Sequence, residues 1–167
     1  MTYNAKAIAN LLIDIAREKG SYVDQMKLQK LVYVTHGWNL AITGQPLISD
    51  DIQAWQYGPV IPSLYSEFRN CGRENITDYA TDIKIAEEDL SFSFETPKVS
   101  NDDSHTIELA NKIWAIYGAY SGPQLSNLTH MANTPWDKVY KTSPRASISN
   151  ELIAEHFVSL SQSRDVQ

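Results

Sequence analysis

The predicted fold depends on one stretch, Lys27-Leu28-Gln29-Lys30-Leu31-Val32-Tyr33, and on its continuation Gly37-Trp38. At helical spacing this region carries apolar side chains on one face and a second apolar set on nearly the opposite face. A helix that is apolar on two faces belongs at the centre of a domain. Gly37 allows a neighbouring helix to approach closely, at a cost of about 1 kcal/mol in helix propensity. Lys27 and Lys30 flank the first apolar face, and we expect them at a solvated helix edge.

Capping residues mark further helices on both sides of this segment. Asn4 is suited to cap a helix that runs to about Lys19, and Asp24 caps the central helix. Ser121-Gly122-Pro123-Gln124 has the form of a capping box, with serine at the cap and glutamine three positions later. Ser149 caps a final helix. The sequence therefore predicts a mainly α protein.

A short hairpin is predicted between the helices. Phe92 and Phe94 alternate with polar residues, which is typical of a strand with one face buried. Ile83 and Ile85 are the expected partner of this strand. We expect the pair to form a small, half-buried antiparallel sheet.

The length and composition fit a single domain. A chain of 167 residues with 43% hydrophobic content can bury roughly 70% of its unfolded surface. We assign residues 1–167 to one helical domain with a small antiparallel β insertion, which is variable and spans about 73–100. The polar tail 161–167 is expected to fray.

The charge of the chain is concentrated in one segment. From Arg73 to Glu108 there are ten acidic and three basic residues, a net charge of −7, so the rest of the chain carries +1 of the total of −6. Nucleic-acid binding needs a basic surface, and we therefore expect no direct nucleic-acid partner. The acidic segment permits a basic protein partner, and the alternative is a solvated loop.

The sequence also bears on the compartment. No apolar run approaches the roughly 20 residues that span a bilayer, and the first residues lack the pattern of a signal peptide. Cys71 is the single cysteine, which rules out a disulfide within the chain. We expect a cytoplasmic protein without a membrane partner.

Few residues point to catalysis. No two histidines have the spacing of a helical zinc pair, and no glycine-rich phosphate loop is present, so we expect neither metal nor cofactor. A small hydrolase is the alternative class, for which Ser121, His130 and Asp137 are the residues to consider. Ser121 is better explained as a helix cap. We assign no catalytic residue and expect that the chain is not an enzyme.

A rigid turn follows the central helix. We call Ala54-Trp55-Gln56-Tyr57-Gly58-Pro59-Val60-Ile61-Pro62 the corner, because two prolines and a glycine restrict its shape. Trp55 and Tyr57 lie in it, and Trp136 follows a proline between two later helices. Tryptophan and tyrosine are frequent in protein interfaces. These three side chains either reach a partner or fix loops to the core.

These segments together resemble the Panacea antitoxin-domain family, which includes phage-associated GepA-like and SocA-like proteins. The resemblance lies, in order, in Lys27 to Tyr33, Gly37-Trp38, Ile52 to Arg69, Leu109 to Gly118, Ser121 with Leu125, Leu128-Thr129-His130, Pro135-Trp136 and the closing helix. The acidic insertion is not part of it.

The resemblance implies a mostly helical protein that neutralises toxins of unrelated folds by direct contact. It implies a cognate toxin encoded by an adjacent gene as partner, and for SocA-like members a protease to which the toxin is delivered. On this basis we expect an antitoxin-like protein in a toxin–antitoxin system. Its expected partner-binding residues are Trp55, Tyr57, Arg69 and Trp136.

Overall fold

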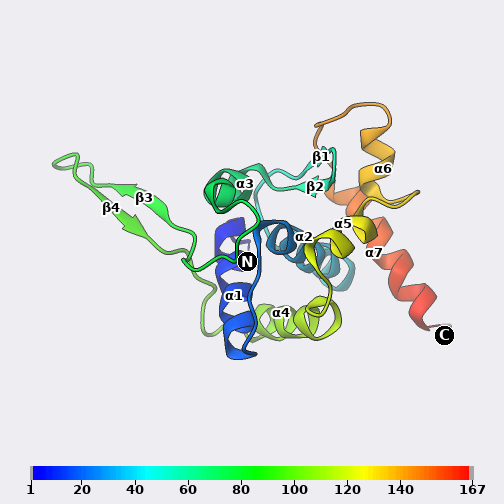
Figure 1. The fold of residues 1–167 in the computed structure, drawn as a ribbon, viewed down its shortest axis with the longest axis horizontal. Coiled ribbons are helices and arrows are strands. Elements are labelled where there is room, and N and C mark those ends of the chain that lie inside the picture. Colours follow the sequence, from blue (N-terminus) through cyan, green and yellow to red (C-terminus); the bar gives the residue numbers. More distant parts are fainter. Residues whose placement is uncertain (1, 166–167) are drawn as a thin grey trace.

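Helix α2 (Gln25–Thr43) runs through the centre of the protein, as Figure 1 shows. The structure is a computed structural model that describes residues 2–165. The Asp24 carboxylate accepts a hydrogen bond from the Lys27 amide at 2.8 Å and caps α2, and Gly44 ends it with φ +72°. Within the described residues, five other helices pack against α2, namely α1, α3, α4, α5 and α7. The predicted central position of this helix is confirmed.

The other helices and strands precede and follow α2 in the chain. They are α1 (Ala5–Glu18), β1 (Gln53–Trp55), β2 (Gly58–Val60), α3 (Pro62–Phe68), a 3₁₀ turn (Arg69–Cys71), β3 (Asp82–Ile85), β4 (Phe92–Glu95), α4 (Ser104–Tyr117), α5 (Gly122–Thr129), α6 (Pro135–Tyr140) and α7 (Asn150–Asp165). The two strand pairs form separate antiparallel sheets, so the predicted mainly α class is confirmed. Within residues 2–165 no helix is both long and apolar enough to cross a membrane.

Two helices differ from the sequence prediction. Helix α6 was missed, because the sequence before it looks like a helix break. In the structure Thr134 caps α6 and Pro135 occupies its first turn, where a missing amide hydrogen has no consequence. Helix α7 continues to Asp165, through most of the tail that we expected to fray, and residues 166–167 lie outside the described part.

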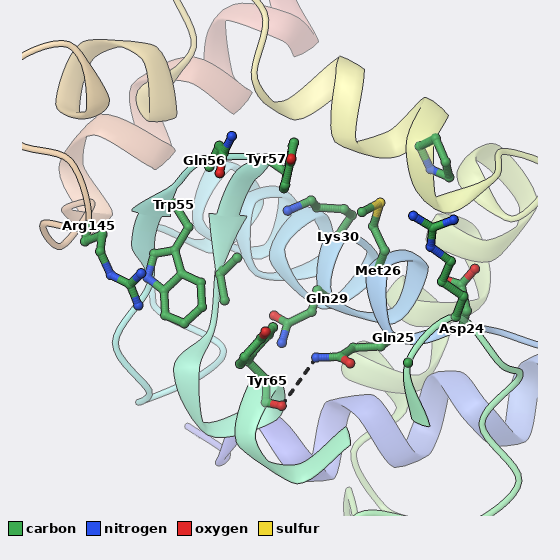
Figure 2. Close-up of a pocket in the computed structure, with 14 residues that line it drawn as sticks. Asp24, Gln25, Met26, Gln29, Lys30, Trp55, Gln56, Tyr57, Tyr65 and Arg145 are labelled. Carbon is green, nitrogen blue, oxygen red and sulfur yellow. Dashed lines mark hydrogen bonds between the residues drawn. The ribbon is translucent and has the colours of Figure 1, made fainter. Parts of the chain in front are cut away.

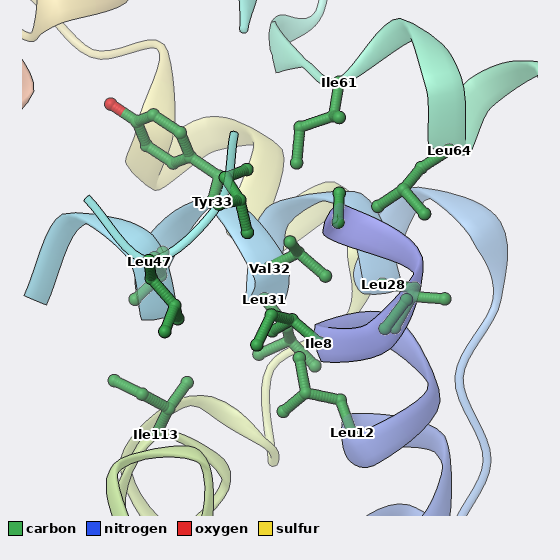
Figure 3. Packing of buried hydrophobic residues seen from close by; sticks show 14 of the residues in the cluster. Ile8, Leu12, Leu28, Leu31, Val32, Tyr33, Leu47, Ile61, Leu64 and Ile113 are labelled. Atoms are coloured by element: carbon green, nitrogen blue, oxygen red, sulfur yellow. The ribbon is translucent and has the colours of Figure 1, made fainter. Parts of the chain in front are cut away.

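The core forms where α1, α4 and the corner meet α2 (Figure 3). Its labelled members are Ile8, Leu12, Leu28, Leu31, Val32, Tyr33, Leu47, Ile61, Leu64 and Ile113. All of these side chains are almost fully buried. Burying one such aliphatic side chain stabilises the fold by about 1.5–3 kcal/mol, so the contacts between α2 and its neighbours are a large contribution to stability.

Helix α7 approaches α2 at Gly37, as predicted for a neighbouring helix. The Phe157 ring lies so close that a Cβ on Gly37 would be 2.2 Å from Phe157 Cε2. The same ring meets Tyr33 and Trp38 edge to face, with centroid distances of 5.9 and 5.3 Å. Gly37 is therefore required for this aromatic contact.

The β3–β4 hairpin has the predicted pairing but not the predicted burial. Ile83 pairs with Phe94 and Ile85 with Phe92, in antiparallel register. All four side chains are exposed, because the hairpin extends beyond the helices and none of the described elements covers either face (Figure 1). The expectation of a half-buried sheet was wrong: alternation showed that the two faces differ, but not that one is covered.

We predict that Gly37→Ala destabilises the protein. The added methyl group collides with Phe157, and overpacking costs about 1–3 kcal/mol. Over most of this range the cost is larger than the gain of about 1 kcal/mol in helix propensity. Urea unfolding measures the change, with Ile42→Ala on the exposed side of α2 as control, for which we expect less than about 0.5 kcal/mol. Equal stability of Gly37→Ala and the unaltered chain would contradict the close packing of α7.

Candidate functional site

The corner folds as a tight hairpin made of β1 and β2. Ala54 pairs with Pro59 and Trp55 with Gly58, whose φ of +116° favours glycine. The turn between the strands consists of Gln56 and Tyr57. The outer edge of β1 is paired as well, since the Arg145 amide donates to the Ala54 carbonyl at 2.7 Å. The corner is thus hydrogen-bonded on both edges of β1.

Helix α2 holds the corner from below through two polar side chains. The Gln29 side chain accepts from the Ile61 amide at 2.9 Å and donates to the Ile61 carbonyl at 3.2 Å. Lys30 Nζ donates to the Pro59 carbonyl at 2.7 Å. Both residues belong to the stretch that places α2 in the centre, so the same helix turn builds the core and fixes the corner.

Lys30 is buried, contrary to our expectation of a solvated edge. Only 2% of the residue is exposed, and burial lowers its pKa from 10.5 to about 7. Lys27 is half-buried, with Nζ 2.5 Å from the Gly118 carbonyl and 5.0 Å from the centre of the Trp114 ring. Residues 28–40 of α2 are all buried, so the helix has no solvated edge at Lys30. That consequence of the sequence pattern was missed.

Trp136 supports the corner from α6. Its indole nitrogen donates to the Trp55 carbonyl at 2.5 Å, and its ring stacks on Tyr140 at 4.6 Å. Ser126 adds a second support from α5, where its hydroxyl donates to the Tyr57 carbonyl at 2.6 Å. Trp136 is only 8% exposed. The sequence left open whether Trp136 reaches a partner or fixes a loop to the core. Its contacts within the chain agree with the second role.

Trp55 and Tyr57 lie at the surface above these supports. Trp55 is half-buried between the Arg145 guanidinium, 4.1 Å from its ring centre, and the Tyr65 ring at 5.0 Å. Tyr57 is 61% exposed. The structure thus brings these two predicted residues together on one surface, with Trp136 beneath them.

A groove of about 640 Å³ opens beside the two aromatic residues (Figure 2). Its walls include Trp55, Tyr57 and Tyr65, and Lys30 lies at its base. Arg73 and Arg145 also line it, and neither was selected from the sequence, because neither belongs to a motif that points to the corner. The groove combines aromatic surface with guanidinium groups.

Arg69 does not line this groove. It is exposed in the 3₁₀ turn that follows α3. Arg73, four residues later, takes a place in the groove wall. Of the four predicted partner-binding residues, two line the groove, one supports it and one lies outside it.

The residues considered for a hydrolase do not assemble. Ser121 caps the start of α5 and His130 its end, so the helix rise of about 1.5 Å per residue separates them by about 13 Å. Ser121 makes the predicted capping box with Gln124. The Asp137 carboxylate accepts from the Asn133 amide at 2.9 Å and contacts Lys141 Nζ at 3.0 Å. A nucleophile and its base must lie within hydrogen-bond reach, which these residues do not.

Comparison with known proteins gives one family. The family described as "Antitoxin SocA-like, Panacea domain" matches residues 28–137, which run from α2 to α6 and include the corner. The chain belongs to this SocA-like Panacea family. Antitoxin SocA of Caulobacter vibrioides (strain NA1000 / CB15N) is 32% identical over 136 residues, which cover 81% of this chain and 70% of that protein. No solved structure matches. The resemblance seen in the sequence is confirmed for a Panacea domain.

We predict that Lys30→Met changes the pH dependence of stability. The unfolded chain holds the Lys30 proton up to about pH 10.5, whereas the folded chain releases it near pH 7. Between these values the unfolded state binds more protons, so the free energy of unfolding of the unaltered chain rises with pH. Methionine does not titrate, and the variant loses this contribution.

The measurement is urea unfolding of both proteins from pH 7 to pH 10. The free energy of unfolding of the unaltered chain, taken relative to that of Lys30→Met, should increase across this range. Other titrating groups are common to both proteins and cancel in the difference. If the difference in the free energy of unfolding between the two proteins stays constant from pH 7 to pH 10, Lys30 is not held neutral by burial.

Proposed function

We propose that this chain is an antitoxin that neutralises a cognate toxin protein by direct binding in the cytoplasm. The partner is the product of an adjacent gene, and the chain acts by covering the toxin's active surface rather than by catalysis. Membership of the SocA-like Panacea family supports an antitoxin role. The observation that carries the proposed binding site is the exposed Tyr57 beside an aromatic, guanidinium-lined groove.

The groove has the properties of a protein-binding surface. Interface residues that contribute most to affinity are enriched in tryptophan, tyrosine and arginine. Here Trp55, Tyr57 and Arg145 lie together, and the backbone beneath them is held by α2, α5 and α6. A site that is rigid before binding loses little conformational entropy on binding.

The four predicted residues take different roles in this proposal. Trp55 and Tyr57 contact the toxin directly, and Arg69 adds an exposed cation from the 3₁₀ turn. Trp136 acts through the corner that it supports. A further step can be tested, in which the chain delivers the bound toxin to a protease. This step predicts that the amount of toxin in the cell falls on co-expression, whereas covering the active surface alone leaves the amount unchanged.

We predict that Tyr57→Ala weakens toxin binding about 10- to 100-fold without unfolding the protein. The side chain is largely exposed, so its loss removes contact surface but little core. Tyr22→Ala is the matched control, since Tyr22 is 60% exposed and does not line the groove. The products of the flanking genes are co-expressed singly with each variant, and growth rescue and complex affinity are measured.

Different outcomes of this experiment separate the candidate functions. Failure of the unaltered chain to rescue growth or to form a complex with any flanking product would sink the antitoxin proposal. If Tyr57→Ala binds the toxin as tightly as the unaltered chain does, the groove is not the binding site. For the hydrolase alternative, Ser121→Asn keeps a good helix cap but removes the hydroxyl. Loss of rescue by this variant, with the complex intact, would point to catalysis.

A further inference from the structure

The β3–β4 hairpin, residues 82–95, presents an apolar face to solvent, and we call it the arm. Because paired residues of an antiparallel ladder share a face, Ile83, Ile85, Phe92 and Phe94 lie together. Each of these side chains is between 63% and 69% exposed. The Phe92 and Phe94 rings are in edge-to-face contact at 6.5 Å. Contiguous apolar patches of this kind on a protein surface mark interaction sites.

The tip of the arm adds a fifth apolar side chain. Leu90 is 78% exposed and has φ +57°, a left-handed conformation that is unfavourable for leucine. The tip is closed by hydrogen bonds from the Ala86 amide to the Ser91 carbonyl and from the Leu90 amide to the Ala86 carbonyl. Leu90 therefore adds exposed apolar surface at the tip of the arm.

The base of the arm is clamped to α1. The buried Asn10 side chain donates to the Ala80 and Pro97 carbonyls at 3.0 and 2.9 Å, one on each side of the hairpin. Lys6 Nζ contacts Asp82 at 2.8 Å and donates to the Thr81 carbonyl at 2.9 Å. The arm is thus held in a fixed direction, away from the helices in Figure 1. Fixing the direction before binding lowers the entropic cost of docking.

The charge of the arm indicates which kind of partner covers its apolar face. The arm carries five acidic residues and one lysine, with Glu87, Glu88 and Asp89 side by side at the tip. A second copy of this chain also carries a net charge of −6 and would repel these carboxylates, as would an anionic membrane. A positively charged protein surface attracts them. The charge therefore favours a cationic protein over a second copy of this chain.

We propose that the arm docks its apolar face into an apolar cleft on a cationic protein and that its acidic tip meets the positive rim of this cleft. This inference rests on the proposed function, because it identifies that protein with the toxin. The arm is a contact separate from the groove, since none of its residues lines the groove. The toxin would be held at two places on the antitoxin.

The test measures binding to the flanking-gene product that the unaltered chain neutralises. Phe92→Ser combined with Phe94→Ser removes the aromatic surface and should weaken binding about 10- to 100-fold. Glu87→Lys combined with Glu88→Lys should slow association and reduce its dependence on salt. Lys84→Arg combined with Ser93→Ala alters the opposite face of the same strands without changing the charge and should bind like the unaltered chain. Thermal unfolding should be the same for all, because these side chains are exposed.

Each outcome bears on the inference in a defined way. If the Phe92/Phe94 variant binds with unchanged affinity, the proposal that the arm contacts the toxin is wrong, and the groove proposal is unaffected. Sedimentation that shows a dimer of the free chain, which the same variant dissociates, assigns the face to a second copy and also overturns it. If the unaltered chain binds no flanking product, the proposed function and this inference fail together.

Discussion

The corner keeps its shape because α2 supplies the hydrogen bonds that its backbone lacks. Gln29 pairs with both the amide and the carbonyl of Ile61, as a neighbouring strand would, and Lys30 Nζ reaches the Pro59 carbonyl. A buried backbone group without a partner costs about 1–3 kcal/mol, so these bonds allow the corner to pack on the core. The position of the aromatic surface depends on them, since Trp55 and Tyr57 belong to the same short hairpin.

The same helix explains why a charged residue is tolerated at this depth. Lys30 is surrounded by protein, and burial favours its neutral form, which can still donate to the Pro59 carbonyl. Trp136 and Ser126 hold the neighbouring carbonyls of Trp55 and Tyr57 from two other helices. The corner is therefore fixed by α2, α5 and α6 together, and the exposed side chains above it are presented on a rigid base.

Prediction from the sequence succeeded where the signal was local. The caps Asp24 and Ser121 marked helix starts correctly, because a cap acts on the next three residues. The strand with Phe92 and Phe94 was recognised from its alternation, and the segment with Ile83 and Ile85 is its partner as expected. Trp55 and Tyr57, two of the residues that line the groove, were found in this way, since they belong to a recognisable turn. Arg73 and Arg145 were not, because only chain packing brings them to the groove.

The sequence by itself determined the helical class, the central helix, the two strands of the hairpin and the family, since these depend on spacing, capping and motif order. The tertiary structure alone decided three further features: Lys30 is buried, Trp136 lies beneath the corner, and the arm is uncovered. Each depends on which elements meet in space. A periodic pattern shows that two faces of an element differ, but whether a face is covered depends on neighbours that are distant in the chain.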